Sequence, residues 1–154
     1  MLFSGRKHQS SRADLARYAA TVEEILASLN IDLGAARIDT EQGYGWSFRR
    51  GTAVIEVYIS EHDNVGYLQV LSPIVVLPES GLLPLYRRLL ELNLQLTNAS
   101  LGVYYDVINV FNERPLEALD PEEADSIIRM VAAYADDLDN KLVGEFGGRL
   151  YSQV

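Results

Sequence analysis

Apolar residues recur along the chain with two different periods, and the changes of period divide it into expected helices and strands. From residue 11 to residue 29 they recur at steps of three and four, the period of a helix that buries one side. The apolar positions of this expected helix are Leu15, Tyr18, Val22, Ile25, Leu26 and Leu29. Asn30 and Gly34 follow, and both are typical of the end of a helix.

The period then becomes two, which predicts three strands within residues 44–77. In the first strand, Tyr44, Trp46 and Phe48 share one face, and residues 49–51 form a turn. The second strand alternates between an apolar face, with Ala53, Ile55, Val57 and Ile59, and a more polar one, with Thr52, Glu56 and Tyr58. A polar turn at residues 61–66 leads to the third strand, residues 67–77, which is interrupted near Pro73. Residues 35–39 are a candidate for one more short strand.

The segment GLLPLYRRLLELNLQLT, residues 81–97, predicts a second helix that is apolar over a wide angle. Its apolar positions are Leu83, Leu85, Tyr86, Leu89, Leu90, Leu92, Leu94 and Leu96. They cover roughly 200° of the helix, whereas a helix on one side of a sheet needs about 100°. The excess favours a two-fold copy of the same helix as a second partner over a helix enclosed within its own chain. The expected dimer-interface residues are Leu82, Leu85, Tyr86, Leu89, Leu90 and Asn93.

Two further strands, at residues 101–105 and 108–113, precede a last helix that begins at Asp120. Asp106 and Val107 join these strands without the glycine that a tight hairpin prefers. The order α-β-β-β-α-β-β-α, with short links between neighbouring strands, predicts an α+β fold with an antiparallel sheet. We expect a flexible N-terminal tail at residues 1–10, a single domain at residues 11–146 and a C-terminal tail at residues 147–154.

Charge and composition narrow the partners and the location. The chain has 154 residues, a formal net charge of −9 and no cysteine. A negative field repels nucleic-acid backbones and anionic membranes, so we expect neither as a partner. The basic residues Arg6, Lys7, His8 and Arg12 favour a solvated tail over a nucleic-acid-binding arm. No segment approaches the ~20 apolar residues of a membrane-spanning helix, and the lack of cysteine fits the cytoplasmic location that we expect.

The stretch ALDPEEAD contains four carboxylates within six positions, Asp120, Glu122, Glu123 and Asp125. Aspartate before proline, with an acid three positions later, is typical of a helix start. A calcium-binding loop would need ligands at alternate positions and a central glycine, and this stretch has neither. We therefore interpret the group as a helix start and expect no metal.

The sequence shows no catalytic or cofactor-binding motif. His62, between Glu61 and Asp63, could act as a base, but a histidine in a polar turn is more often a surface residue. The glycines of GEFGGR, residues 144–149, follow a helix and lack the lysine of a phosphate-binding loop. We expect no enzyme and no cofactor, with a small hydrolase or metal-dependent enzyme around His62 as the alternative.

The aromatic row of the first strand leaves a functional question open. Tyr58 and Tyr67 are expected beside Tyr44, Trp46 and Phe48 on neighbouring strands. If the helices cover the opposite face, the row is a peptide-binding platform; if they cover this face, it is core, which is the favoured interpretation. The protein-binding candidates are accordingly Tyr44, Trp46, Phe48 and Tyr58.

Residues 82–148 resemble a known family. The helix segment LLELN, the pattern PL..LD.EE at residues 115–123 and the ending D..L...FGG at residues 139–148 are similar to the YbjN family of bacterial proteins, which has a type III secretion chaperone-like fold. The glycine or aspartate hairpin that is usual between the two late strands is missing here.

The resemblance implies a homodimer packed through the second helix and a non-enzymatic role. Secretion chaperones of this fold bind an extended segment of a client protein, and YbjN-like proteins are described as sensory transduction or stress regulators. We therefore expect a chaperone-like or regulatory homodimer that binds an unidentified protein or peptide client. A purely structural dimerisation module is the other alternative.

Overall fold

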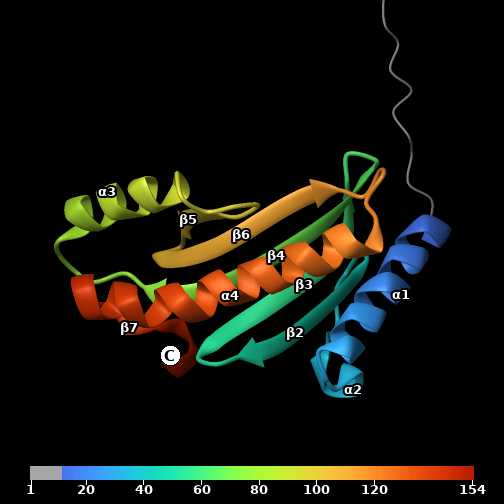
Figure 1. Ribbon diagram of the computed structural model, residues 1–154, viewed down its shortest axis with the longest axis horizontal. Coiled ribbons are helices and arrows are strands. Elements are labelled where there is room, and N and C mark those ends of the chain that lie inside the picture. The colour runs from blue at the N-terminus through green and yellow to red at the C-terminus, as the bar shows by residue number, and fades with distance from the viewer. Residues whose placement is uncertain (1–11) are drawn as a thin grey trace, which may run out of the picture.

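The computed structural model describes residues 12–154, so the tail expected at residues 1–10 lies outside the described part (Figure 1). The helices are α1 (Arg12–Ser28), the single turn α2 (Leu33–Ala36), α3 (Leu82–Asn93), α4 (Pro121–Phe146) and the 3-10 turn η1 (Tyr151–Gln153). The strands are β1 (Arg37–Ile38), β2 (Tyr44–Arg50), β3 (Ala53–His62), β4 (Val65–Val76), β5 (Ser100–Tyr104), β6 (Val107–Pro115) and β7 (Arg149–Leu150).

All strands belong to one antiparallel sheet in the order β1-β2-β3-β4-β6-β5, and β7 pairs with the end of β4. This confirms the predicted α+β class and the order of the main elements. The short elements α2, β7 and η1 are additions, and β1 lies within the candidate strand at residues 35–39. No helix in residues 12–154 is long and apolar enough to cross a membrane.

The start of α4 confirms the interpretation of the acidic stretch. The side chain of Asp120 accepts a hydrogen bond from the backbone N–H of Glu123 at 2.8 Å, and Pro121 occupies the first turn. The N-cap side chain satisfies a free backbone amide of the first turn. The acidic residues of that turn interact favourably with the positive end of the helix dipole. Asp125 accepts a hydrogen bond from Arg129, four residues later, at 2.9 Å on the exposed side of the helix.

The hairpin between β5 and β6 turns one residue earlier than the sequence suggested. Tyr105 and Asp106 form the turn, and Val107 already belongs to β6. Their φ angles are 46° and 59°, so two residues other than glycine adopt the left-handed conformation that a two-residue turn requires. Tyr104 and Tyr105 pack edge to face there, with ring centroids 4.4 Å apart.

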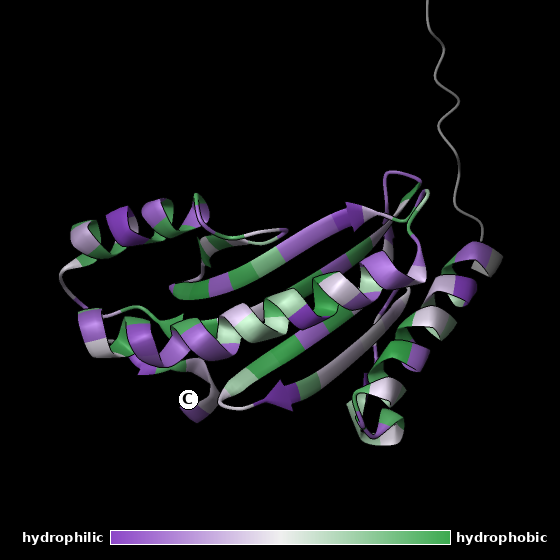
Figure 2. Cartoon of the chain, viewed as in Figure 1, coloured by the Kyte–Doolittle hydropathy of each residue, from purple (hydrophilic) through white to green (hydrophobic). Residues whose placement is uncertain are grey.

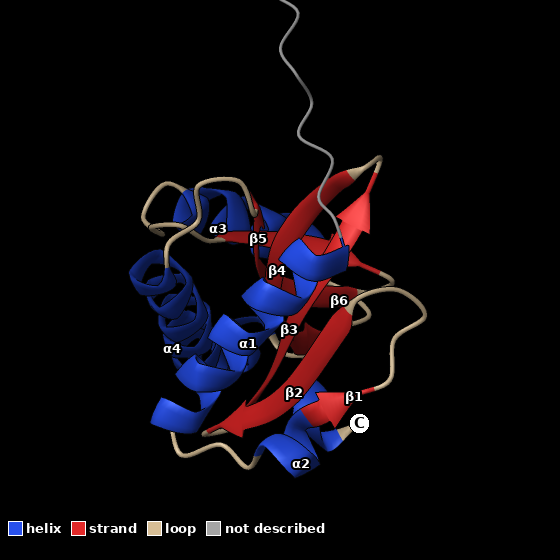
Figure 3. Ribbon diagram, turned by 90° about the vertical axis from the view of Figure 1, so that its right-hand side faces the viewer, coloured by secondary structure: helices blue, strands red, loops and turns tan. Residues whose placement is uncertain are grey.

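One face of the sheet is covered by α1 and α4, and the core lies between (Figures 1 and 3). Hydrophobic positions lie along the strands that α4 crosses (Figure 2). The fully buried strand residues on this face include Ile55, Val57, Ile59, Leu68, Val70, Ile108 and Val110. Alternation places Tyr58, Tyr67, Leu71 and Phe111 on the opposite face, where they are only partly buried.

A buried polar group joins α4 to the turn between β2 and β3. The Asp139 carboxyl group is 1% exposed and accepts a hydrogen bond of 2.5 Å from the Thr52 hydroxyl. The neighbouring Asn140 donates its backbone N–H to Asp139 at 2.6 Å and its side-chain amide to Thr52 at 3.0 Å. Because buried polar groups are costly unless they are paired, this network holds the turn against the helix.

Candidate functional site

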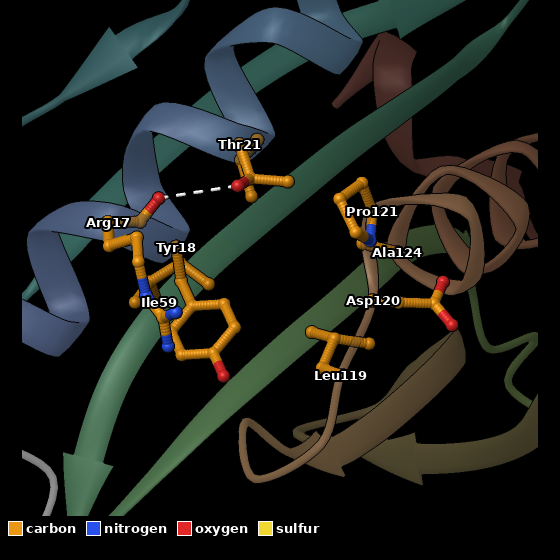
Figure 4. A pocket seen from close by; sticks show the side chains of 9 residues that line it. Arg17, Tyr18, Thr21, Ile59, Leu119, Asp120, Pro121 and Ala124 are labelled. Carbon is orange, nitrogen blue, oxygen red and sulfur yellow. Dashed lines mark hydrogen bonds between the residues drawn. The ribbon is translucent and has the colours of Figure 1, made fainter.

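A pocket of about 270 Å³ lies between α1 and the start of α4 (Figure 4). Its apolar lining comes from three separate parts of the chain and consists of Tyr18, Val22, Ile59, Leu119, Pro121 and Ala124. Arg17, Thr21 and Asp120 add polar groups to it. An apolar hollow with a few polar groups is the usual form of a ligand-binding site.

Local structure explains why the pocket stays open. Pro121 begins α4 and Asp120 caps it, so the helix cannot extend further towards α1. On the other side, the Arg17 guanidinium stacks over the Tyr18 ring, 4.8 Å from the ring centroid. The Thr21 hydroxyl donates a hydrogen bond to the backbone carbonyl of Arg17 at 3.3 Å, so its proton is already paired within α1. The pocket therefore offers mainly apolar surface, and a guanidinium group at Arg17.

The aromatic candidates do not form one exposed platform. Trp46 is 1% exposed in the core, beneath α1, so the favoured core interpretation is correct for this residue. Phe48 packs partly buried against the core, and Tyr44, 39% exposed, stacks on Trp46 with ring centroids 6.3 Å apart. Tyr58 was wrongly expected beside them. It lies opposite Gly45 in the β2–β3 register and so points to the other face of the sheet.

An acidic side chain of α1 ties this aromatic row in place. The indole N–H of Trp46 donates to Glu23 at 3.2 Å, and Arg37 binds the same carboxylate at 2.7 Å and 3.0 Å. The hydrogen bond from Arg37, with a smaller one from Trp46, lowers the pKa of Glu23 against the opposing effect of burial. On the other face, burial and a hydrogen bond to Glu56 raise the pKa of Tyr58 to about 12.

The expected dimer-interface residues divide between the two sides of α3. Leu85 and Leu89 are 1% and 5% exposed and pack into the core. Asn93 donates its side-chain amide to the backbone carbonyl of Leu101 and accepts from the backbone N–H of the same residue. These contacts join α3 to β5. Leu82 is partly buried.

Tyr86 and Leu90 point outwards, with 36% and 68% of their surface exposed. Leu83 and Leu94, which were not among the expected interface residues, are 80% and 90% exposed. The adjacent edge strand β5 and the turn after it also carry exposed apolar side chains. We call this set the α3–β5 surface: Leu83, Tyr86, Leu90, Leu94, Val103, Tyr104 and Tyr105.

The alternative enzymatic site is placed at the turn between β3 and β4. His62 is exposed there, and its Nε2 atom lies 3.3 Å from a carboxylate oxygen of Asp63. In the described part of the chain, no group of three or more histidine, aspartate or glutamate side chains has an arrangement that could hold a metal ion.

Comparison with known proteins agrees with the resemblance inferred from the sequence. A family model named TY-Chap1, described as "T3SS (YopN, CesT) and YbjN peptide-binding chaperone 1", matches residues 17–154. None of the curated proteins is similar enough to match the chain.

Among solved structures, a chain of the HopA1–SchA chaperone–effector complex is 11% identical, with a TM-score of 0.61 over 85% of this chain and 99% of that chain. A chain of the ExsC–ExsE complex is 14% identical, with a TM-score of 0.61 over 83% of this chain and 95% of that chain. At such identities the likeness shows a common fold.

Proposed function

The chain belongs to the TY-Chap1 family of peptide-binding chaperones, and from this premise we propose that it binds an extended segment of a client protein as a non-enzymatic homodimer. The observation that carries the proposal is the apolar pocket between α1 and α4. Its walls come from α1, β3, the link before α4 and the first turn of α4, and its volume of about 270 Å³ suits one large apolar side chain of a client.

Filling the pocket is expected to weaken client binding without unfolding the protein. In Thr21→Trp, the indole occupies space that a client side chain would use, because Thr21 is partly buried and lines the pocket. Binding to an array of synthetic peptides should weaken by roughly tenfold or more, corresponding to the loss of one apolar contact. Fluorescence anisotropy of the strongest peptides from the array measures this loss.

Ala20→Trp is the matched control, because Ala20 is the preceding residue of α1, is exposed and does not line the pocket. It should bind the peptides as the unaltered protein does. Equal binding by both variants would remove the pocket from the proposal. If the unaltered protein also bound no peptide, the purely structural dimerisation module would be favoured instead.

For the homodimer we propose the α3–β5 surface as the interface. Leu83, Tyr86, Leu90 and Leu94 follow one another at steps of three and four and form a stripe along α3. Exposed apolar groups of this kind are typical of protein–protein contacts, and a two-fold partner can cover the stripe with its own copy. The unpaired edge of β5 lies beside it and carries further apolar residues.

Leu90→Asp is expected to convert the dimer into a monomer, because it places a charge at the centre of the stripe. Light scattering should report half the mass at the same protein concentration, while the circular dichroism spectrum stays unchanged since Leu90 is 68% exposed. Ser126→Asp adds the same charge to an exposed position of α4 and should leave the mass unaltered. A monomeric unaltered protein would contradict the proposed interface.

We further infer a cytoplasmic, non-catalytic and regulatory role from the same set of observations. The chain lacks cysteine, and its net charge of −9 disfavours nucleic acid and anionic membranes as partners. The peptide-binding chaperones of the family support client binding as the mode of action, and a regulator acts through such binding.

A further inference from the structure

The end of the described chain fills a gap in the sheet. β3 pairs with β4 from Val65 to Leu71, and β7 pairs with the same strand farther along, at Val75 and Val76. The expected tail at residues 147–154 thus supplies a strand and a 3-10 turn rather than only a loose exit from α4. We call residues 147–154 the β7 segment.

The β7 segment makes two kinds of contact. Leu150 lies directly opposite Val75 and is 8% exposed, so its side chain is received on the face of the sheet that α4 covers. η1 then packs on β3 and β4, and Figure 3 shows the end of the chain on the side of the sheet away from α4. Tyr151, at the start of η1, lies near enough to Tyr58 to contribute to the raised pKa of that residue.

Two glycines make this docking conformation accessible. Gly147 and Gly148 have φ angles of 81° and 86°, in the left-handed region. A Cβ atom on Gly148 would also lie 2.4 Å from the backbone oxygen of Val76. The docked state therefore requires glycine at position 148. Because only two residues pair with β4, the segment can also open locally while the rest of the sheet stays folded.

We propose that the β7 segment occupies, within its own chain, a binding slot for an extended peptide that has a leucine followed by an aromatic residue. The slot offers the backbone groups of Val75 and Val76 for strand pairing, a buried place for the leucine, and the surface of β3 and β4 for the aromatic ring. A peptide from another protein binds by displacing the segment. This slot goes beyond the pocket between α1 and α4 and requires neither that pocket nor the dimer.

Tethering makes the segment a strong competitor. A short linker gives it an effective concentration of about millimolar at its own slot, so a free peptide binds well only when docking is weakened. In Gly148→Ala the added Cβ meets the Val76 oxygen and the residue resists a positive φ, which should weaken docking roughly tenfold. The probe is a fluorescein-labelled peptide with the sequence of residues 147–154, GGRLYSQV, measured by anisotropy with the full chain.

Gly148→Ala should bind this probe roughly tenfold more tightly than the unaltered protein. Gly144→Ala is the matched control, since Gly144 lies in α4 with open space around it and its substitution should leave binding unchanged. A probe carrying Leu150→Asp should not bind to either variant. If Gly148→Ala binds the probe no more tightly than Gly144→Ala does, the slot is a fixed part of the fold and the proposal is wrong.

A second variant tests displacement without relying on Gly148. Val76 and Arg149 are directly opposed, and such pairs have Cα atoms about 4.5–5.5 Å apart, within the range of a disulfide. The chain has no cysteine, so Val76→Cys with Arg149→Cys creates a single bond that locks the segment in place. The oxidised protein should not bind the probe, whereas the reduced protein should bind it with about the affinity of the unaltered protein. Equal binding in both forms would overturn the proposal.

Discussion

Replacing Trp46 with alanine is expected to lower the free energy of unfolding by about 3–5 kcal/mol. Trp46 is 1% exposed and belongs to the core between the sheet and the helices. The substitution leaves a large cavity. It also removes the indole N–H that donates a hydrogen bond to the Glu23 carboxylate at 3.2 Å. Urea unfolding followed by circular dichroism measures the loss. Fluorescence is unsuitable because Trp46 is the only tryptophan of the chain.

Two further variants separate cavity formation from the hydrogen bond. Trp46→Phe retains much of the buried volume and loses the N–H, so it should cost clearly less than alanine. Tyr44→Ala, at a residue 39% exposed, should cost about 1 kcal/mol. A Trp46→Ala protein that keeps its stability but loses peptide binding would restore the exposed platform that the sequence left open.

Alternation along the strands predicted which side chains share a face, but not which face the helices cover. Tyr44, Trp46 and Phe48 do lie on one face, as their spacing indicates. Both faces of β3 and β4 carry large apolar side chains, including Tyr58 and Leu71, so the pattern alone could not assign the core. The register between β2 and β3 places Gly45, rather than Trp46, opposite Tyr58.

The wide apolar angle of α3 was recognised from the sequence, but its inner and outer halves were not separated. Leu85 and Leu89 contact the core, whereas Leu90, the next residue, is 68% exposed. Positions 83, 86, 90 and 94 follow a helical stripe of their own, and this spacing could have identified Leu83 and Leu94. Which of the two stripes faces the core depends on where the sheet lies, and local periodicity carries no information about that position.

The pocket and the β7 segment were missed because each depends on residues far apart in the chain. Tyr18, Ile59 and Leu119 meet only when α1, β3 and the link before α4 come together. The sequence did indicate that Asp120 and Pro121 begin a helix, and this helix start turns out to line the pocket. The glycines before Arg149 do follow the last helix, as the sequence indicates, but nothing local predicts that Leu150 pairs with Val75.

Replacing Asp139 with alanine is expected to lower the free energy of unfolding by about 3 kcal/mol, because three hydrogen bonds of roughly 1 kcal/mol each are lost. Asp139 is 1% exposed and accepts from the Thr52 hydroxyl, the Asn140 backbone N–H and the Asn140 side-chain amide. The Thr52 hydroxyl is then left without its acceptor at the base of the β2–β3 hairpin. Thermal and urea unfolding both measure this effect.

Asp139→Asn should fall between alanine and the unaltered protein. The carbonyl oxygen of the new side chain can still accept hydrogen bonds from Asn140. Its NH2 group, however, faces the Thr52 hydroxyl and cannot accept the hydrogen bond that this hydroxyl donates to Asp139 in the unaltered protein. Asp137→Ala is the control on the same helix. It removes only an exposed pair with Lys141, so its cost should stay below about 0.5 kcal/mol. If Asp139→Ala and Asp137→Ala cost the same, the buried network around Asp139 contributes nothing to stability, and the hairpin is held to α4 by apolar packing and by the hydrogen bond from the Thr52 backbone N–H to Asp136.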